Sequence, residues 1–261
     1  MRKVYSSDVS REQFAIIEPF LAKVKVKTKE RELDLYEIFC AILYRLKNGC
    51  RWRDLPSDFP EWAAVYYYFR KWTRKRDGFS ALDYVLGILE DLYRASKGRE
   101  LSPSMLLGDS KTIQNADTAE EKGYDGAKKK TGVKIHMAAD VFGFPYVLGI
   151  STANVTDRDG MIELFTQPYY PLSRFEKLLL DGAYTGEDFA DKIKVLTGAE
   201  VEVVKRPEMN KFVVIPKRWV VERSFGWLDK CWLLWKNCER LLSSTLSFVK
   251  FAFVSVLLKR F

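Results

Sequence analysis

Three carboxylates stand where a metal-dependent reaction could use them. Asp109 ends the apolar stretch LLGD, Asp181 ends LLLD, and Glu222 lies among large apolar residues in the segment 216–235. A single aspartate at a strand end commonly just caps a turn. Two such ends and a glutamate on an apolar helix favour one shared site instead, because a carboxylate that is buried alone is strongly destabilising.

Carboxylates that cluster repel one another unless cations lie between them. Two divalent ions about 4 Å apart, bridged by one aspartate, would neutralise Asp109, Asp181 and Glu222 and catalyse phosphoryl transfer. Ligands that are all oxygen favour Mg²⁺ or Mn²⁺ over zinc. The chain has one histidine and four cysteines, and the cysteines form no CxxC pair, which argues against a Cys/His zinc site.

Arg218 precedes Glu222 by four residues, so the two side chains share one face of the expected helix. Their spacing fits an ion pair that makes the glutamate tolerable. It fits equally an arginine that contacts a DNA phosphate beside the metal ions. The two interpretations are compatible.

The elements that must hold these residues follow from the apolar periodicity. The first hundred residues predict only helices, over 10–22, 33–46, 61–76 and 83–96. The pattern then changes to strands over 104–110, 133–141, 146–152, 175–181 and 200–204, with helices over 157–167, 186–198 and 216–235. We therefore expect a mixed α/β fold in two domains, an all-helical region over 1–100 and a mixed five-stranded sheet with packed helices over 101–261.

The net charge of +8 is unevenly distributed. Residues 1–100 carry 20 Lys+Arg against 15 Asp+Glu, and residues 205–261 carry 12 against 4. The stretch 101–204 between them carries 11 against 16. Basic flanks around an acidic centre suggest that the flanks hold a polyanion and that the centre uses its carboxylates.

Two basic segments are candidates for DNA contact. One is the end of the expected helix 61–76, and the other is the expected loop 118–132 with the start of the following strand. A solvated helix end, favoured by the helix dipole, or a solvated charge run would look the same. The only histidine is expected to be a structural or phosphate-side contact rather than a general base. The candidate contacts are Arg70, Lys71, Arg74, Lys75, Arg76, Lys128, Lys129, Lys130, Lys134 and His136.

At these residues the chain resembles bacterial insertion-sequence transposases of the DDE type, in the insertion-sequence-five group that is related to eukaryotic Harbinger elements. The matching segments occur in the family's order and cover nearly the whole chain. They are NGCRWRDLPSDFPEWAAVYYYFRKW, LGDSKTIQNA, KGYDGAKKKTGVKIH, NVTDRDG, LLLDGAY and PKRWVVERSFGWL.

The resemblance implies an RNase H-like core in which Asp109, Asp181 and Glu222 bind two Mg²⁺ or Mn²⁺ ions. It implies hydrolysis at the transposon ends to free 3′-OH groups, which then attack target DNA directly. The N-terminal helices would recognise the terminal inverted repeats, and Arg218 and Lys230 would contact phosphate. The expected partners are the inverted repeats and target DNA, both double-stranded, bound by a homodimer or larger assembly.

The resemblance and the apolar pattern also bear on location. No secretory leader is visible, and the longest apolar run near the end, FAFVSVLL, is too short to span a bilayer. We expect a cytoplasmic, nucleoid-associated bacterial protein with no membrane partner. Two alternatives stay open: a catalytically inactive DNA-binding relic, and a metal-dependent nuclease of the same fold.

Overall fold

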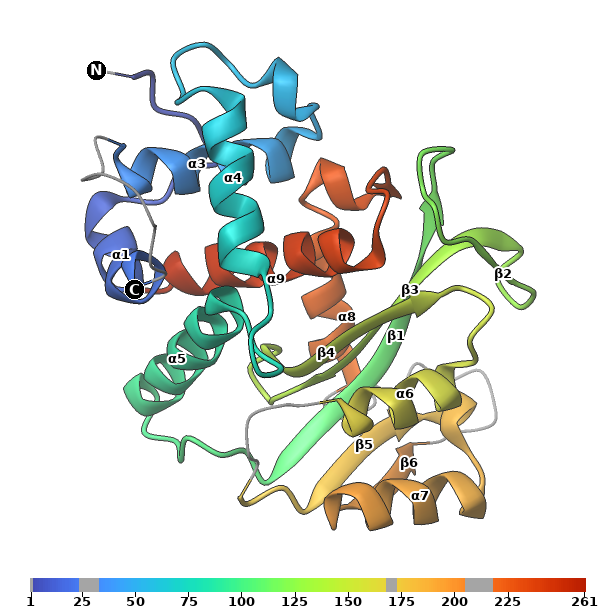
Figure 1. The fold of residues 1–261 in the computed structure, drawn as a ribbon. Coiled ribbons are helices and arrows are strands. Elements are labelled where there is room, and N and C mark those ends of the chain that lie inside the picture. The colour runs from blue at the N-terminus through green and yellow to red at the C-terminus, as the bar shows by residue number, and fades with distance from the viewer. Residues whose placement is uncertain (1, 24–32, 168–172, 205–217) are drawn as a thin grey trace. The chain divides into compact units, whose positions relative to one another are not determined.

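The computed structural model describes residues 2–23, 33–167, 173–204 and 218–261, and the chain forms two compact units (Figure 1). Unit 1 comprises Met1–Lys97, Leu228–Trp235 and Ser247–Phe261, and unit 2 comprises Gly98–Trp227 and Lys236–Leu246. The chain first passes from unit 1 to unit 2 between Lys97 and Gly98, close to the expected boundary at residue 100. The later segments differ from the expected division, because two stretches of the C-terminal part belong to the helical unit.

The elements of unit 1 are helical. The predicted helix over 10–22 is divided in two, because Pro19 lies in the first turn of its second half and has no N–H to continue the hydrogen-bond ladder. Gly49, with φ of 69°, ends the next helix in the left-handed conformation. The elements are α1 (Arg11–Ala15), α2 (Glu18–Ala22), α3 (Leu35–Asn48), η1 (Trp52–Asp54), α4 (Trp62–Thr73), α5 (Ala81–Ser96), η3 (Trp232–Leu234) and most of α9 (Leu242–Leu258).

Aromatic packing explains why α9 returns to unit 1. The ring of Phe248 stacks on Phe69 at 4.8 Å between centroids, and Phe251 lies 6.0 Å from Phe39. Phe39 in turn lies 6.4 Å from Trp72. All five rings are fully buried. Each aromatic pair adds about 0.5–1.5 kcal/mol beyond the area that it buries, so α9 completes the core of this unit.

A buried ion pair joins α9 to α5. The Lys250 ammonium lies 2.5 Å from an oxygen of Asp83. Burial opposes ionisation of this carboxyl, but the Lys250 charge and the hydrogen bonds from Ser80 hold the pKa of Asp83 below its usual value. Asp83 also accepts from the backbone N–H of Ser80 and thereby closes the capping box at the start of α5. One carboxylate thus fixes both the start of α5 and the position of α9.

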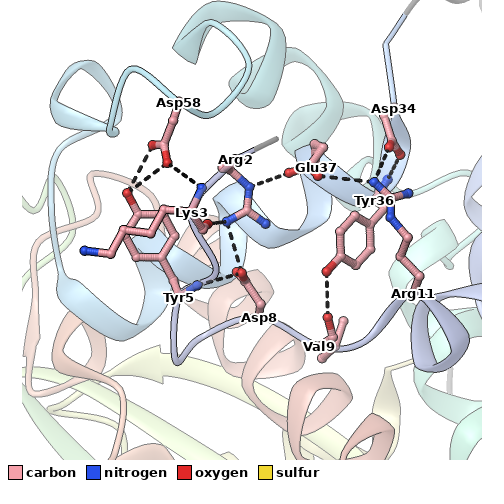
Figure 2. Close-up of polar contacts among 10 residues, drawn as sticks. All are labelled: Arg2, Lys3, Tyr5, Asp8, Val9, Arg11, Asp34, Tyr36, Glu37 and Asp58. Atoms are coloured by element: carbon pink, nitrogen blue, oxygen red, sulfur yellow. Dashed lines mark hydrogen bonds and ion pairs between the residues drawn. The ribbon is translucent and has the colours of Figure 1, made fainter.

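The first residues of the chain are held to unit 1 by polar contacts (Figure 2). Arg2 pairs with Asp8 at 3.0 Å and with Glu37 of α3, and the Tyr5 hydroxyl donates to Asp58 at 3.0 Å. Around the start of α3, the hydroxyl of Tyr36 donates to a backbone carbonyl, and Arg11 pairs with both Asp34 and Glu37.

Unit 2 is built on a mixed sheet. The five expected strands are present, and two short ones join them: β2, in the stretch expected to be a loop, and β7, after the final expected helix. Strand β1 pairs antiparallel with β3 and parallel with β5, β6 is parallel to β5, and β4 is antiparallel to β3. The strands are β1 (Met105–Asn115), β2 (Gly123–Asp125), β3 (Lys130–Ala139), β4 (Pro145–Thr152), β5 (Lys177–Asp181), β6 (Glu200–Val204) and β7 (Lys236–Asn237).

Helices pack on both faces of this sheet. On one face lie α6 (Asp157–Thr166) and α7 (Glu187–Thr197), as Figure 1 shows; their apolar residues share a core with Leu106, Leu178 and Leu180. Helix α8 (Arg218–Leu228) packs through Trp227, whose ring stacks on Phe144 at 5.2 Å. The expected α/β class with an all-helical N-terminal region is confirmed. No helix in the described parts of the chain is long and apolar enough to cross a membrane.

Close packing between α6 and β3 depends on a glycine. A Cβ on Gly160 would lie 2.0 Å from Cε1 of His136, a side chain that is itself buried. The imidazole is held by a contact of 2.9 Å between its Nε2 and the Ser151 hydroxyl, so it has no free space into which to move. Only glycine lets the helix approach the sheet this closely.

We therefore expect Gly160→Ala to destabilise the protein. Alanine gains up to about 1 kcal/mol of helix propensity over glycine, but overpacking a core costs about 1–3 kcal/mol, and the clash here is severe. Urea unfolding should show a net loss of about 2 kcal/mol. Gly126→Ala is the matched control, since a Cβ there meets nothing within 4 Å. Equal stability of the two variants would contradict the packing argument.

Candidate active site

Two of the three candidate carboxylates lie at equivalent positions of neighbouring parallel strands. Strands β1 and β5 pair in the register Met105 with Lys177 and Leu107 with Leu179. Asp109 and Asp181 each follow two residues after that last leucine pair, on the same side of the sheet as the leucines. Residues far apart in the sequence are thereby brought to the same level.

Both aspartates line one small cavity. Its wall also contains Leu107 and Leu179, Val204 from β6 and Val221 from α8. The cavity measures about 20 Å³, which is room for about one water molecule or ion. Each aspartate is partly exposed, and each is oriented by the backbone: Asp109 accepts from the N–H of Ser110 at 2.7 Å, and Asp181 from the N–H of Ala183 at 2.9 Å.

A buried tyrosine reports on the charge around this cavity. Tyr184, just after β5, is 1% exposed. Burial raises its pKa well above the usual value, and the negative charges of Asp109, Asp157 and Asp181 raise the pKa further. Because charges act over short distances in a protein, the tyrosine lies near all three carboxylates. The Tyr184 hydroxyl thus lies beside the acidic region that contains Asp109 and Asp181.

Glu222 lies on the exposed side of α8. Its neighbours Val220 and Val221 are buried, whereas Glu222 faces solvent, so the helix does not bury a carboxylate. The cost of burying a carboxylate alone therefore does not arise for Glu222. Val221 lines the cavity of the two aspartates, which brings the backbone of Glu222 to the edge of the same region.

The residues present fit a hard divalent cation in type, because carboxylate oxygens are the donors that Mg²⁺ and Mn²⁺ prefer. Asp109 and Asp181 share the cavity. Within residues 2–23, 33–167, 173–204 and 218–261, no three or more Asp, Glu, His or Cys side chains are gathered closely enough to hold a metal ion. The geometry thus joins two of the predicted ligands and leaves Glu222 beside them on α8.

Another acidic side chain, that of Asp157, was not among the candidates and lies on the opposite face of β1 from Asp109. The Ser110 hydroxyl donates to Asp157 at 2.7 Å, and the Lys134 ammonium pairs with the same Asp157 oxygen at 2.8 Å. Lys134 also donates to the carbonyl of Val155 and lies 3.6 Å from Asp125. Asp157 is the first residue of α6, where the predicted helix over 157–167 begins. The sequence feature that could have predicted part of this network is strand alternation, because the side chains of Asp109 and Ser110 must lie on opposite faces of the sheet.

Two of the candidate DNA contacts are buried. Lys134 is 4% exposed and is engaged by the network around Asp157. His136 is 2% exposed, and burial, followed by the charge of Lys134, lowers the pKa of His136 to about 4. The histidine is therefore neutral near pH 7 and packs against α6. Neither side chain has a surface from which to reach a phosphate. Strand β3 is buried on both faces from Gly132 to Ala139, so both side chains are enclosed.

The basic helix end differs from its prediction. Helix α4 stops at Thr73, three residues earlier than expected, so the last three cations do not lie on a helix. Asp77 and Gly78, with φ of 50° and 90°, form the tight turn that follows. Arg76 and Phe79 exchange two backbone hydrogen bonds across it, of 2.7 and 3.1 Å. The Asp-Gly pair was the sequence signal for this turn.

Most of the remaining basic candidates lie on the surface. Arg70 is exposed on α4, Lys71 is half-buried, and Arg74, Lys75 and Arg76 are exposed around the turn. In unit 2 the exposed lysines form the tip of the hairpin between β2 and β3. Lys230, just after α8, is exposed, and Arg218 begins α8 with a side chain outside the described set. The hairpin lysines are Lys128, Lys129 and Lys130.

The lowered pKa of His136 predicts a pH-dependent stability. An imidazole with a pKa of about 4 in the folded chain and about 6.5 in the unfolded chain stabilises the fold above pH 6.5. That stability is lost as the pH falls toward 4, at up to about 1.4 kcal/mol per pH unit, because the unfolded chain binds the proton first. Urea unfolding between about pH 4.5 and 7.5 should show this slope.

Because the chain has a single histidine, His136→Gln is a clean comparison. The variant should lose the slope in this range even if it is less stable throughout. Parallel pH profiles for the two proteins would show that the folded chain does not shift this pKa.

Comparisons with known proteins agree with this arrangement. A search of curated proteins returns no match. Residues 9–78 match a family described as transposases of the IS4/5 family, and residues 100–257 match the transposase DDE domain. The second match contains Asp109, Asp181 and Glu222. It also accounts for the sheet order, since a DDE domain has an RNase H-like core, and that expectation is confirmed.

The matches also state the class of substrate. A transposase acts on DNA, so the chain is a DNA-binding protein and a nucleic-acid-cleaving enzyme. DDE domains generally work with divalent metal ions. Because the DDE match alone covers more than half of the 261 residues, the chain belongs to the DDE transposases of insertion sequences, in the IS4/5 family.

Proposed function

We propose that this transposase binds the terminal inverted repeats of its element, cleaves the element's ends to free 3′-OH groups and joins them to target DNA. Asp109, Asp181 and Glu222 are the proposed ligands of two Mg²⁺ or Mn²⁺ ions. The observation that carries the proposal is the pair of aspartates at matching positions of β1 and β5, lining one cavity inside a DDE domain.

The chain's own residues have distinct tasks in this proposal. Asp109 and Asp181 hold the cations from the sheet, and their backbone hydrogen bonds restrict how the carboxylates turn. Glu222 completes the set from α8, where its exposure leaves it accessible to a cation at the cavity mouth. When bound, the divalent ions would activate the attacking oxygen and stabilise the leaving oxygen. Neither step needs ATP or a covalent bond between protein and DNA.

The proposed DNA contacts are the exposed cations at the end of α4, in the turn that follows it and on the β2–β3 hairpin. The family resemblance adds the two cations that flank α8. Exposed lysines and arginines bind phosphates at all sequences, so they position DNA rather than read it. A dimer or larger assembly would hold two ends together. Lys134 and His136 are left out because they are buried, and Lys71 is left out because its ammonium nitrogen is buried. The set is Arg70, Arg74, Lys75, Arg76, Lys128, Lys129, Lys130, Arg218 and Lys230.

The proposed metal ligands can be tested by the DNA cleavage and joining reactions. With Mg²⁺ and a duplex that carries the element's terminal repeats, the wild type should nick the end and form joined products. Asp109→Asn, Asp181→Asn and Glu222→Gln should each reduce both by more than about a hundredfold, since losing a group that merely orients a metal ligand already costs about 10–100-fold. Glu163→Gln, an exposed acid on α6, is the matched control.

A second readout separates ligand loss from other damage. Mn²⁺ should raise the melting temperature of the wild type, because a ligand of the folded state stabilises it, and this rise should vanish in Asp109→Asn. Nicking without joining in the wild type would favour the metal-dependent nuclease. DNA binding without cleavage by any protein would favour the inactive relic and remove Glu222 from the metal site.

The exposed cations predict a salt-dependent affinity. Each phosphate contact contributes about 0.9 to the slope of log K against log[salt], so Arg70→Ala and Lys75→Ala should each lower that slope by about one. Lys192→Gln is the control, because this exposed lysine on α7 pairs with Asp188 and is not a proposed contact. Unchanged slopes for the first two variants would remove the end of α4 from the DNA-binding surface.

A further inference from the structure

A cavity of about 370 Å³ opens in unit 1 beside the end of α4. Four parts of the chain form its wall: α2 and the residue after it, the end of α4, the Asp77–Gly78 turn and the start of α5. The volume falls in the range of about 300–1,000 Å³ that is typical of sites enclosing a small molecule. A DNA duplex is too wide to enter such a cavity, but one of its nucleotides is not.

The charged lining of this cavity is asymmetric. Lys23, Lys71, Arg74 and Arg76 line it, against the single carboxylate of Asp77, a balance of three positive charges. A concave surface with this balance attracts an anion. The two arginines are suited to phosphate in particular, because a guanidinium donates two parallel hydrogen bonds to its oxygens.

Aromatic rings line the same cavity. Phe79 and Tyr84 lie 5.8 Å apart between ring centroids, and Tyr84 is 48% exposed. Phe20 lies on the α2 side, with the ammonium of Lys23 5.7 Å from its ring centre. Aromatic faces beside arginines and lysines are the combination with which proteins hold the bases and the backbone of unpaired strands.

We propose that this cavity binds one unpaired nucleotide of a DNA strand, with the base against Phe79 and Tyr84 and the phosphate between Arg74 and Arg76. A paired base is stacked between its neighbours and does not present its faces, so the cavity selects a base that has left the helix. The proposal rests on the proposed DNA binding by unit 1 and adds to it. In this proposal Arg74 and Arg76 bind a nucleotide that has left the duplex, in addition to the phosphates on the outside of the duplex.

The test uses the full chain and three duplexes of one sequence. The first is fully paired, the second carries one extra unpaired 2-aminopurine nucleotide, and the third carries one extra abasic nucleotide. The variant is Tyr84→Leu. Tyr67→Leu is the matched control, because Tyr67 is 50% exposed on α4 and does not line the cavity.

The wild type should bind the 2-aminopurine duplex at least about fivefold more tightly than the other two, the lower end of what one base–aromatic stack contributes. Tyr84→Leu should lose this preference, and Tyr67→Leu should keep it. The 2-aminopurine fluorescence should fall on binding to the wild type and to Tyr67→Leu, and should fall less with Tyr84→Leu.

Four results would overturn the proposal, and they differ in how much of the proposed DNA binding they leave intact. Equal affinity for all three duplexes, or equal effects of the two variants, would make the cavity lining an ordinary duplex contact. Binding of the abasic duplex as tight as that of the 2-aminopurine duplex would reduce the cavity to a phosphate site. No binding of any duplex would overturn the proposed DNA recognition as well.

Discussion

The parallel pairing of β1 with β5 is the constraint on which the rest of unit 2 depends. A parallel pair cannot be closed by a tight turn, so the chain between these strands must travel out and back, and here it builds β3, β4 and α6 on the way. Parallel strands must also be covered on both faces. The pairs Leu106–Leu178 and Leu107–Leu179 are accordingly apolar, and the first carboxylates stand two residues beyond the second pair.

The two faces of β1 treat negative charge differently. On the α6 face, Asp157 is neutralised within the fold by Lys134 and by the hydroxyl of Ser110. On the opposite face, Asp109 and Asp181 surround a cavity whose other walls are Leu and Val side chains. The alternation of side chains along β1 thus separates Asp157, which is neutralised within the fold, from Asp109 and Asp181, which line the cavity. A cation would be bound most favourably beside these two aspartates.

Much of this arrangement could be predicted from the sequence. The stretches LLGD and LLLD, each apolar up to its acid, predict both strands and the shared level of Asp109 and Asp181, although β1 continues past Asp109 to Asn115. The errors have local causes that pattern alone does not reveal. Pro19 divides one helix, the Asp77–Gly78 turn shortens another, and burial takes His136 away from the surface because Gly160 admits a helix against it. Such effects depend on what packs beside a residue, which a single sequence does not state.

The site itself was only partly predictable. Spacing and residue type identified the carboxylates, but the exposure of Glu222 depends on which side of α8 faces the sheet. The apolar residues around that glutamate suggested burial, because a helix with apolar residues on most of its surface gives no single inner face. Tertiary packing decides the matter by burying Val220, Val221 and Phe225 and leaving Glu222 and Trp219 outside.

The return of α9 to unit 1 sets the order in which the protein can be completed during synthesis. Phe39 and Phe69 emerge from the ribosome early, but their partners Phe251 and Phe248 emerge only after all of unit 2. Until then the aromatic core of unit 1 has an open side and Asp83 lacks its ammonium partner. All of unit 2 has been synthesised by that stage. The residues that are made first therefore belong to the core that is completed last.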